Sequence, residues 1–227
     1  MKQSVILLKN KWMKKEVDYI YICDQFKAIR QDLTVQTIKN DFTVEVYETH
    51  AKLALENNDL SEFNQCQTQL KLLYEEGFAG HQMEFLAYRI LYLLNPTVKK
   101  GMEQVLYTIQ ELSDEQKQHE YVKHALQVQC ALALQNYFLF FKLYLASPNM
   151  GAILLDKFID SVRLSSLRIM FKSYRPSIPV SFVSKQLAFR NEHACLLFLK
   201  QYDIKFLENT NQLGWHIDAV KSTIRAS

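Results

Sequence analysis

Residues 29–36 read Ile-Arg-Gln-Asp-Leu-Thr-Val-Gln, residues 46–52 read Val-Tyr-Glu-Thr-His-Ala-Lys, and residues 63–70 read Phe-Asn-Gln-Cys-Gln-Thr-Gln-Leu. A helix that buries one face needs apolar residues at steps of three and four, yet glutamines crowd these segments. Because a buried amide without a partner is costly, we expect hydrogen bonds between neighbouring helices. Solvated helix faces are the alternative. The glutamines concerned are Gln31, Gln36, Gln65, Gln67 and Gln69.

The apolar residues around these segments predict a helix from residue 34 that packs on two sides and ends at Asn57 and Asn58. Asp59 and Glu62 then form a capping-box pattern that begins the next helix, the Asp59 carboxylate accepting backbone N–H groups and Glu62 reaching back. The first apolar stripe comprises Val35, Ile38, Phe42, Val46, Thr49 and Leu53, and the second comprises Tyr47, Ala51, Ala54 and Leu55.

Short helices with brief connections continue to about residue 146. We expect them over 63–76, 82–94, 97–112, 117–133 and 135–146. Ser113 and Gln116 give a second capping box. Pairs of helices too small to bury their own apolar faces are typical of helical-repeat stacks, so the sequence predicts a mostly α, TPR-like stack, with a compact bundle as the alternative.

The pattern changes after residue 150. A long helix is expected over 156–174, followed by Pro176 and Pro179. A helix over 181–189, a second helix capped by Asn191 and two extended segments, 205–208 and 216–222, follow. This order of elements is that of a winged helix. We therefore predict a helical-repeat stack over 1–150 and the winged-helix part over 151–227, joined by the long helix.

The charge is unevenly distributed along the chain of 227 residues. Residues 1–30 hold seven Lys and Arg against three acidic residues, residues 31–150 hold nine against 15, and residues 151–227 hold 11 against six. Basic ends indicate an anionic partner, since lysine and arginine attract phosphate backbones through counterion release. A basic surface that is merely solvated is the alternative.

Several classes of protein are disfavoured. The apolar runs near the N-terminus, 5–8 and 19–23, are too short to span or enter a membrane. Four widely spaced cysteines favour a reducing intracellular compartment without disulfides. No glycine-rich phosphate loop, HExxH or CxxC motif occurs, and the six histidines are scattered. We expect no catalytic residue, metal or cofactor, and keep a hydrolase with a spatially assembled triad as an alternative.

The last third of the chain carries two candidate binding surfaces. Basic residues spread over several elements position phosphates without reading bases, and the mostly apolar helix 191–202 offers little base readout, so we predict non-specific contact with RNA or DNA. The candidate residues are Arg168, Lys172, Arg175, Lys185, Arg190, Lys200, Lys205 and Lys221. The second surface is apolar and would dock a protein partner. It comprises Ile204, Phe206, Leu207, Leu213, Trp215 and Ile217.

The basic run over residues 9–15 includes Trp12. Its indole could stack on bases, or it could cap the helical stack by packing against the first helix.

Five segments together carry a family resemblance: 21–36, 46–51, 65–70, 87–91 and 171–176. In them the chain resembles the GANP-type family of PCI proteins, and within it the branch of the leukocyte receptor cluster member and its yeast THP-type counterpart. The resemblance extends from about Asp18 to Ala219. It implies a helical stack ending in a winged helix, and a nuclear role in messenger RNA biogenesis through transcription, splicing, and export or retention. It also implies a complex with a second PCI subunit and a small acidic DSS/SEM-type peptide that mainly wraps the partner.

Three hypotheses follow from the residues and the resemblance together. The first is a non-enzymatic nuclear scaffold that also binds nucleic acid. The second is a pure protein scaffold of a proteasome-lid or signalosome-like assembly. The third is the unrecognised hydrolase.

Overall fold

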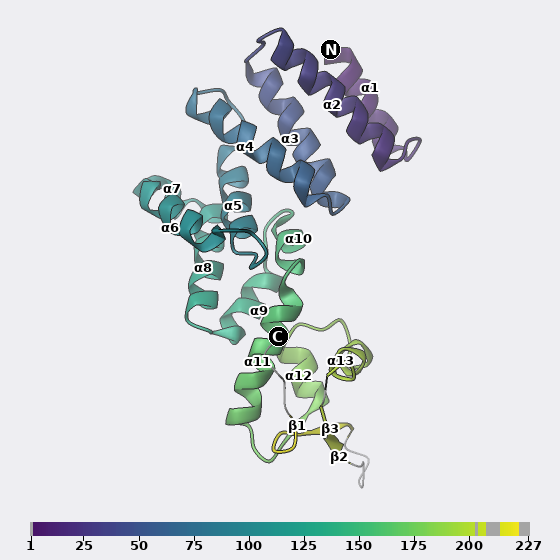
Figure 1. Cartoon of the computed structure of the whole chain (residues 1–227), viewed down its shortest axis with the longest axis vertical. Helices are drawn as coiled ribbons and strands as arrows, with labels where there is room; N and C mark the ends of the chain where they lie inside the picture. Colours follow the sequence, from purple (N-terminus) through teal and green to yellow (C-terminus); the bar gives the residue numbers. More distant parts are fainter. Residues whose placement is uncertain (1, 203, 208–213, 223–227) are drawn as a thin grey trace. The chain divides into compact units, whose positions relative to one another are not determined.

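Helices dominate the computed structural model, which describes residues 2–202, 204–207 and 214–222 (Figure 1). The predicted mostly α class is confirmed. The helices are α1 Lys2–Met13, α2 Tyr19–Val35, α3 Asp41–Glu56, α4 Leu60–Glu75, α5 Gln82–Leu93, α6 Gly101–Glu111, α7 Asp114–Gln118, α8 Glu120–Ala133, α9 Tyr137–Leu145, α10 Gly151–Asp156, α11 Ile159–Ser173, α12 Val180–Gln186 and α13 Glu192–Leu199. The strands are β1 Ser177–Pro179, β2 Phe206–Leu207 and β3 His216–Asp218.

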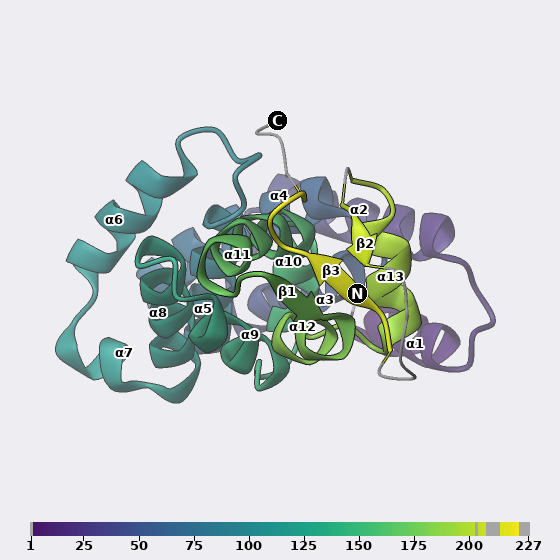
Figure 2. The same cartoon turned by 90° about the horizontal axis from the view of Figure 1, so that it is seen from below.

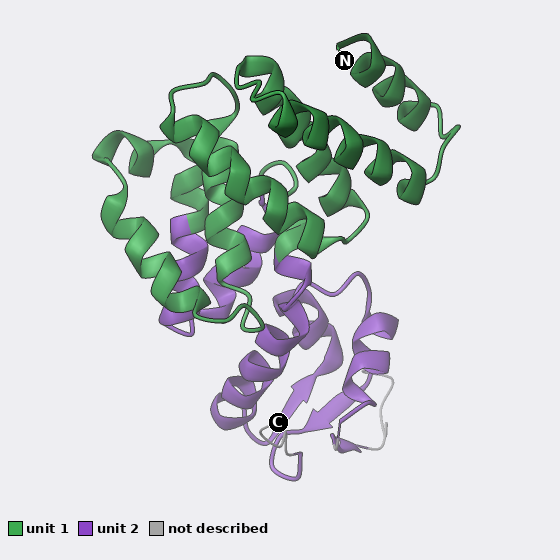
Figure 3. Ribbon diagram, turned by 45° about the horizontal axis from the view of Figure 1, so that its top comes forward, with its two compact units in different colours: residues 1–125, 148–154 green, residues 126–147, 155–227 purple. Residues whose placement is uncertain are grey.

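The chain forms two compact units, coloured separately in Figure 3. Unit 1 comprises residues 1–125 and 148–154, and unit 2 comprises residues 126–147 and 155–227. Residues 126–147 thus group with the C-terminal part of the chain. The predicted domains, 1–150 and 151–227, stay a prediction.

Within unit 1, α3 packs against both α2 and α4, so it is buried on two sides as its two apolar stripes predicted. Its predicted start at residue 34 is wrong. α2 ends at Val35, Thr37 has a positive φ of 55°, and Asn40 caps α3 by accepting from the Thr43 N–H at 3.1 Å. Ile38 and Phe42 still pack on the hydrophobic cluster of α2 and α3. The apolar spacing therefore runs on through a break in the helix.

The predicted helix starts are supported by side-chain caps. Asp59 Oδ1 accepts from the Glu62 N–H at 2.9 Å. Ser113 and Gln116 form a full capping box, but it begins the short helix α7, and the helix predicted over 117–133 is the separate α8. Asn191 accepts from the Ala194 N–H at 2.8 Å. Glu62 does not close the first box, because its carboxylate lies with Arg30 instead. Local polar spacing thus fixed the position of these turns.

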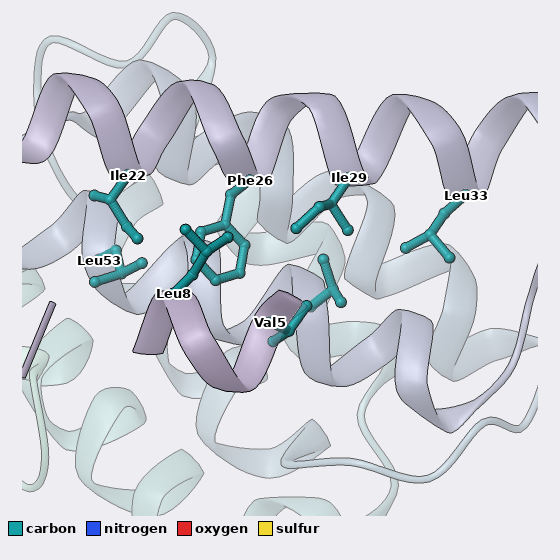
Figure 4. Packing of buried hydrophobic residues seen from close by; sticks show 8 residues of the cluster. Val5, Leu8, Ile22, Phe26, Ile29, Leu33 and Leu53 are labelled. Atoms are coloured by element: carbon teal, nitrogen blue, oxygen red, sulfur yellow. The ribbon is translucent and has the colours of Figure 1, made fainter. Parts of the chain in front are cut away.

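α1 packs against α2 and α3 in a hydrophobic cluster (Figure 4). Val5 and Leu8 of α1 belong to the same buried cluster as Phe26 of α2, and Trp12 packs against this cluster. The Trp12 indole N–H donates to Glu56 at 3.2 Å, and Lys9 pairs with Glu45 at 2.5 Å. These contacts favour the capping role of the basic N-terminal run over base stacking. The buried residues of the cluster are Val5, Leu8, Ile22, Phe26, Ile29, Leu33, Val46 and Leu53.

Unit 2 ends in a module of α11, α12, α13 and a three-stranded antiparallel sheet of order β1-β3-β2. Figure 2 shows β3 between its two neighbours. Ile178, Val183 and Leu199 are buried in the module, each at 1% exposure or less. The order helix, strand, helix, helix, strand, strand contains the two helices and the hairpin predicted for this region, together with an additional strand, β1.

None of the helices in the described residues has the length and apolar character needed to cross a bilayer. The four cysteines are unpaired, and Cys130 is exposed while the others are buried.

Candidate nucleic-acid and partner interface

The central strand β3 organises the C-terminal module. Ile217 lies opposite Ile178 of β1 and Phe206 of β2, and it is fully buried. The hydrogen bonds extend beyond the strands, since the Val180 N–H donates to the Trp215 carbonyl at 2.9 Å. The sheet thus holds the β2–β3 hairpin to the start of α12.

Arg163 of α11 fixes the loop between α12 and α13. Its guanidinium donates to the carbonyl oxygens of Leu187 at 3.2 Å and Ala188 at 2.9 Å, and it lies 3.9 Å from the centre of the Phe189 ring. Ala188 has a positive φ of 50°, so a turn unfavourable for a residue with a side chain is held by the arginine. The sequence does not single out Arg163, because nothing in its pattern distinguishes it from Arg168 and Lys172, the other basic residues of α11.

Most of the predicted basic residues present their side chains to solvent. Lys172, Arg175, Lys185, Arg190, Lys200, Lys205 and Lys221 are exposed, whereas Arg168 is half-buried. Lys221 lies 3.8 Å from the Asp218 carboxylate but remains largely in solvent. The backbone N–H groups of Lys221 and Val220 donate to that carboxylate and lower the pKa of Asp218. The cations therefore come from α11, α12, the loop after it, the end of α13 and the hairpin.

The predicted apolar surface divides into buried and exposed residues. Ile204 and Ile217 are buried in the module at 7% and 0% exposure, so a partner cannot meet their side chains. Leu207 and Trp215 are exposed at 39% and 48%, and Trp215 meets Phe206 edge to face at 5.9 Å. Leu213 lies outside the described residues.

Two further apolar residues of the module face solvent. Leu197 of α13 and Val220 after β3 are exposed at 52% and 58%. Sequence reasoning missed both, since an apolar residue in a short helix or strand reads as core. They are further apolar side chains of the module that a partner could contact.

A cluster of polar and charged side chains lies inside unit 1, where α2, α3 and α4 meet. The Arg30 guanidinium of α2 bonds to the Glu62 carboxylate of α4 and lies 2.9 Å from the Cys66 sulfur. Lys27 adds a second cation 3.4 Å from Glu62. The Arg30 guanidinium also lies 5.4 Å from the centre of the Tyr47 ring. A single buried carboxylate of α4 thus holds two cations of α2.

His50 of α3 completes this cluster without a hydrogen bond from the described residues. The imidazole is fully buried, lies 5.4 Å from the Phe26 ring, and has its Nδ1 atom 4.0 Å from Glu62. Burial, reinforced by the charges of Arg30 and Lys27, lowers the pKa of His50 to about 3. His50 is therefore neutral at physiological pH.

His50, Glu62 and Cys66 offer ligand atoms that lie within 4.8 Å of one another. A metal ion here would compete with the Arg30 guanidinium, which already contacts both the carboxylate and the sulfur. Burial raises the pKa of the Cys66 thiol to about 12, so the sulfur stays protonated. The group is better described as a buried ion pair than as a metal centre.

The hydrolase hypothesis needs an activated nucleophile. Burial raises the pKa of Cys195 to about 12, as it does for Cys66, which is the opposite of thiol activation. These two cysteines therefore act as small buried apolar residues.

The glutamines divide differently from our expectation. Gln31, Gln36, Gln65 and Gln69 are exposed, as in the alternative of solvated faces. Gln67 is buried, and its side-chain amide donates to Asn64 of its own helix at 2.9 Å. The links between helices that we assigned to amides are made instead by Arg30 and Glu62.

Comparison with known proteins gives consistent relatives. A model of the SAC3/GANP family matches residues 4–208. The chain is 48% identical over 209 residues to the THP3 homolog of Schizosaccharomyces pombe, covering 90% of this chain and 52% of that protein. It is 47% identical over 209 residues to the Leukocyte receptor cluster member 8 homolog of Xenopus laevis, covering 92% of this chain and 26% of that protein.

Protein THP3 of Saccharomyces cerevisiae is 35% identical over 207 residues, which is 90% of this chain and 44% of that protein. The chain thus spans about half or less of the length of these curated relatives. The resemblance expected from the sequence is confirmed, and the chain belongs to the SAC3/GANP family.

Proposed function

We propose that this chain is a non-enzymatic scaffold subunit of a nuclear PCI complex in messenger RNA biogenesis. Unit 1 and the helices before α11 supply a TPR-like stack, and the module of α11, α12, α13 and the sheet is its winged helix. The family and its THP3 relatives support this proposal. In it, a second PCI subunit docks on the module, and a small acidic DSS/SEM-type subunit joins mainly through that partner.

The proposed scaffold also binds RNA or DNA without sequence specificity. The observation that carries this part is the exposure of basic side chains on successive elements of one small module, from Lys172 and Arg175 to Lys185 and Arg190. Cations that are solvated and project from several elements neutralise phosphates at little desolvation cost. α13 buries Cys195, Phe198 and Leu199, which leaves few side chains to read base edges.

Charge reversal tests this activity. Replacing Lys172, Arg175, Lys185 and Arg190 with Glu in the complex purified with its partner subunit should weaken binding to a single-stranded RNA and flatten the dependence of affinity on salt. Replacing Lys99, Lys100 and Lys123 of unit 1 with Glu is a control that reverses three exposed charges outside the module. Equal affinity of the quadruple variant and the wild-type complex in a filter-binding assay would refute the nucleic-acid activity.

A pure protein scaffold of a proteasome-lid or signalosome-like assembly is the second candidate function. The exposed apolar residues Leu207, Trp215 and Val220 favour it, since such residues on a small module mark protein contacts. In that case the charge-reversed complex keeps its RNA affinity, and Trp215→Ala weakens binding of the partner subunit. Sedimentation of the chain with and without the partner measures the second effect.

A further inference from the structure

A groove of about 630 Å³ in unit 1 is lined by side-chain amides and hydroxyls. Its lining residues belong to α2 and α4, with Tyr47 from α3. These three helices are labelled in Figure 1. We call this site the amide groove and define it by Gln31, Thr34, Asn64, Gln65, Thr68 and Gln69. It contains Gln31, Gln65 and Gln69, which are not part of the proposed nucleic-acid and partner surfaces.

The amides of the groove have unused hydrogen-bonding capacity. Gln31, Gln65 and Gln69 are exposed, and each primary amide offers two donors and one carbonyl acceptor. The hydroxyls of Thr34 and Thr68 donate to carbonyl oxygens of their own helices, at 2.8 Å in each case. Their remaining lone pairs are acceptors. The walls therefore present donors and acceptors together rather than one charge.

The low net charge of the groove argues against a phosphate backbone as its occupant. Its two cations, Lys27 and Arg30, share the buried Glu62 carboxylate. Arg30 also lies over the Tyr47 ring, which is itself buried and so presents no open face for a base. Arg30 Nε has no hydrogen-bond partner among the described residues, which leaves one donor beside the groove.

The spacing of the lining residues suits an extended chain. Lys27, Gln31 and Val35 follow one another at four-residue steps on α2, as do Gln65 and Gln69 on α4. Eight residues of helix advance about 12 Å, and an extended polypeptide needs about four residues to cover that distance. Each peptide unit of such a segment carries one N–H and one C=O, which is the pair that a glutamine amide matches.

We propose that the amide groove binds an extended, uncharged segment of a partner protein, and that Gln31, Gln65 and Gln69 recognise its main chain. Main-chain recognition makes the site tolerant of the segment's side chains. The proposal concerns unit 1 and is independent of the basic module, so it stands or falls separately from nucleic-acid binding.

A phage-displayed library of random 12-residue peptides, selected against the full chain, provides the probe. We expect selected peptides to lose at least about tenfold in affinity for the triple variant Gln31→Ala, Gln65→Ala and Gln69→Ala, as expected for losing hydrogen bonds worth about 1.4 kcal/mol together. The control carries Gln104→Ala, Gln110→Ala and Gln118→Ala, which replace exposed glutamines elsewhere in unit 1. This control should keep the affinity.

Two further measurements separate the proposal from its rivals. N-methylation of one central peptide bond should weaken binding more than replacing the side chain of the same residue with that of alanine. A 15-residue oligouridylate should not displace the peptide. The proposal is overturned if selection yields no peptide that depends on the three glutamines, if side chains dominate the affinity, or if the oligouridylate binds with the same glutamine dependence.

Discussion

The first five helices and the C-terminal module use charged residues in opposite ways. In unit 1, the carboxylates of Glu48, Glu62 and Glu84 are buried at 4–8% exposure and have partners. In the module, lysines and arginines extend into solvent. The same residue classes therefore stabilise a fold in one region and remain available to a ligand in the other.

The buried carboxylates of unit 1 are each held by more than one donor. Glu48 accepts from the Tyr74 hydroxyl at 2.6 Å and lies 2.7 Å from the ring nitrogen of His81. Glu84 accepts from the Tyr88 hydroxyl at 2.6 Å and pairs with Lys52 at 2.9 Å. Burial, followed by these bonds, raises the pKa values of both tyrosines.

Substitution of a buried carboxylate and of an exposed lysine should have different effects on stability. A carboxylate taken out of water is tolerated only with several partners, so its removal from the cluster disturbs all of them. A solvated lysine has little to lose in the isolated chain and can gain contacts in a complex. The free energies of unfolding of variants in unit 1 and in the module measure this difference.

Breaking the buried ion pair should have the largest effect. Arg30→Met leaves the Glu62 carboxylate buried with only Lys27 nearby, and we expect the free energy of unfolding to fall by about 3–5 kcal/mol. Urea unfolding followed by the fluorescence of Trp12, in a Trp215→Phe background, reports on unit 1. The chain contains two tryptophans, so this background leaves one reporter.

An exposed pair provides the control for this prediction. Lys39 and Glu76 lie 2.5 Å apart but are about half exposed, and Lys39→Met should cost about 1 kcal/mol or less. The double variant Arg30→Met and Glu62→Leu should recover much of the loss, because it leaves no buried charge at this site, and Lys27, which loses its partner, is about half exposed. Equal costs for Arg30→Met and Lys39→Met would show that burial does not distinguish these pairs.

The buried histidine predicts acid sensitivity of unit 1. The pKa of His50 falls from 6.5, its ordinary value, to about 3 in the folded chain, so between these values the unfolded state binds more protons. Stability is therefore lost as the pH falls below 6.5, by about 1.4 kcal/mol per pH unit. From pH 6.5 to 4.5 this amounts to about 2 kcal/mol, because only half of the unfolded histidine is protonated at pH 6.5.

His50→Phe should flatten this dependence, since phenylalanine fills the site beside Phe26 and cannot be protonated. His193→Gln is the control, because His193 is exposed on α13. Urea unfolding of the wild type and both variants at pH 7, 6, 5 and 4.5 measures the slopes. A wild-type slope that persists in His50→Phe would assign the acid loss to other groups.

Within the module, Arg163, like Arg168, is only partly exposed. Arg163→Lys keeps the charge but cannot bridge the Leu187 and Ala188 carbonyl oxygens or lie flat on Phe189. We expect a loss of about 2 kcal/mol, measured by Trp215 fluorescence in a Trp12→Phe background. Lys172→Met on the same helix should change stability by about 0.5 kcal/mol or less. A similar cost for both would mean that the loop holds its turn without Arg163.

The parts of the fold that could be predicted are those set by neighbours in sequence. Asp59, Ser113 and Asn191 are capping residues whose partners lie three residues away, so their spacing is visible in the chain. The break between α2 and α3 was hidden because Ile38 and Phe42 keep the apolar spacing across it. Periodicity reports which residues are buried, and a turn can preserve that period.

The candidate sites were less predictable, because exposure depends on contacts far apart in the sequence. Ile217 and Trp215 are two residues apart and equally apolar, yet the neighbouring strands cover only Ile217. Arg30 and Glu62 are 32 residues apart, and only the packing of α2 and α4 on α3 brings them together. The sequence contains one signal for the site of Arg30 and Glu62. Cys23 and Arg30 are seven residues apart, so both lie on the same side of α2, next to its apolar stripe, and this indicates that this side of the helix is buried.

The smallest effect on the isolated chain is expected at the apolar surface of the module. Val220 is 58% exposed, so Val220→Ser should change the free energy of unfolding by about 0.5 kcal/mol or less, read from Trp215 fluorescence. If the module docks a partner through this surface, the same substitution should weaken the complex by about fivefold or more, because the residue is then buried. Ile217→Ser provides the contrast, since a hydroxyl in the core should unfold the module before any partner is added. If Val220→Ser loses as much stability as Ile217→Ser, both residues stabilise the fold. The exposed side chains of the module would then not be free for a partner, and the module would not differ from unit 1 in this respect.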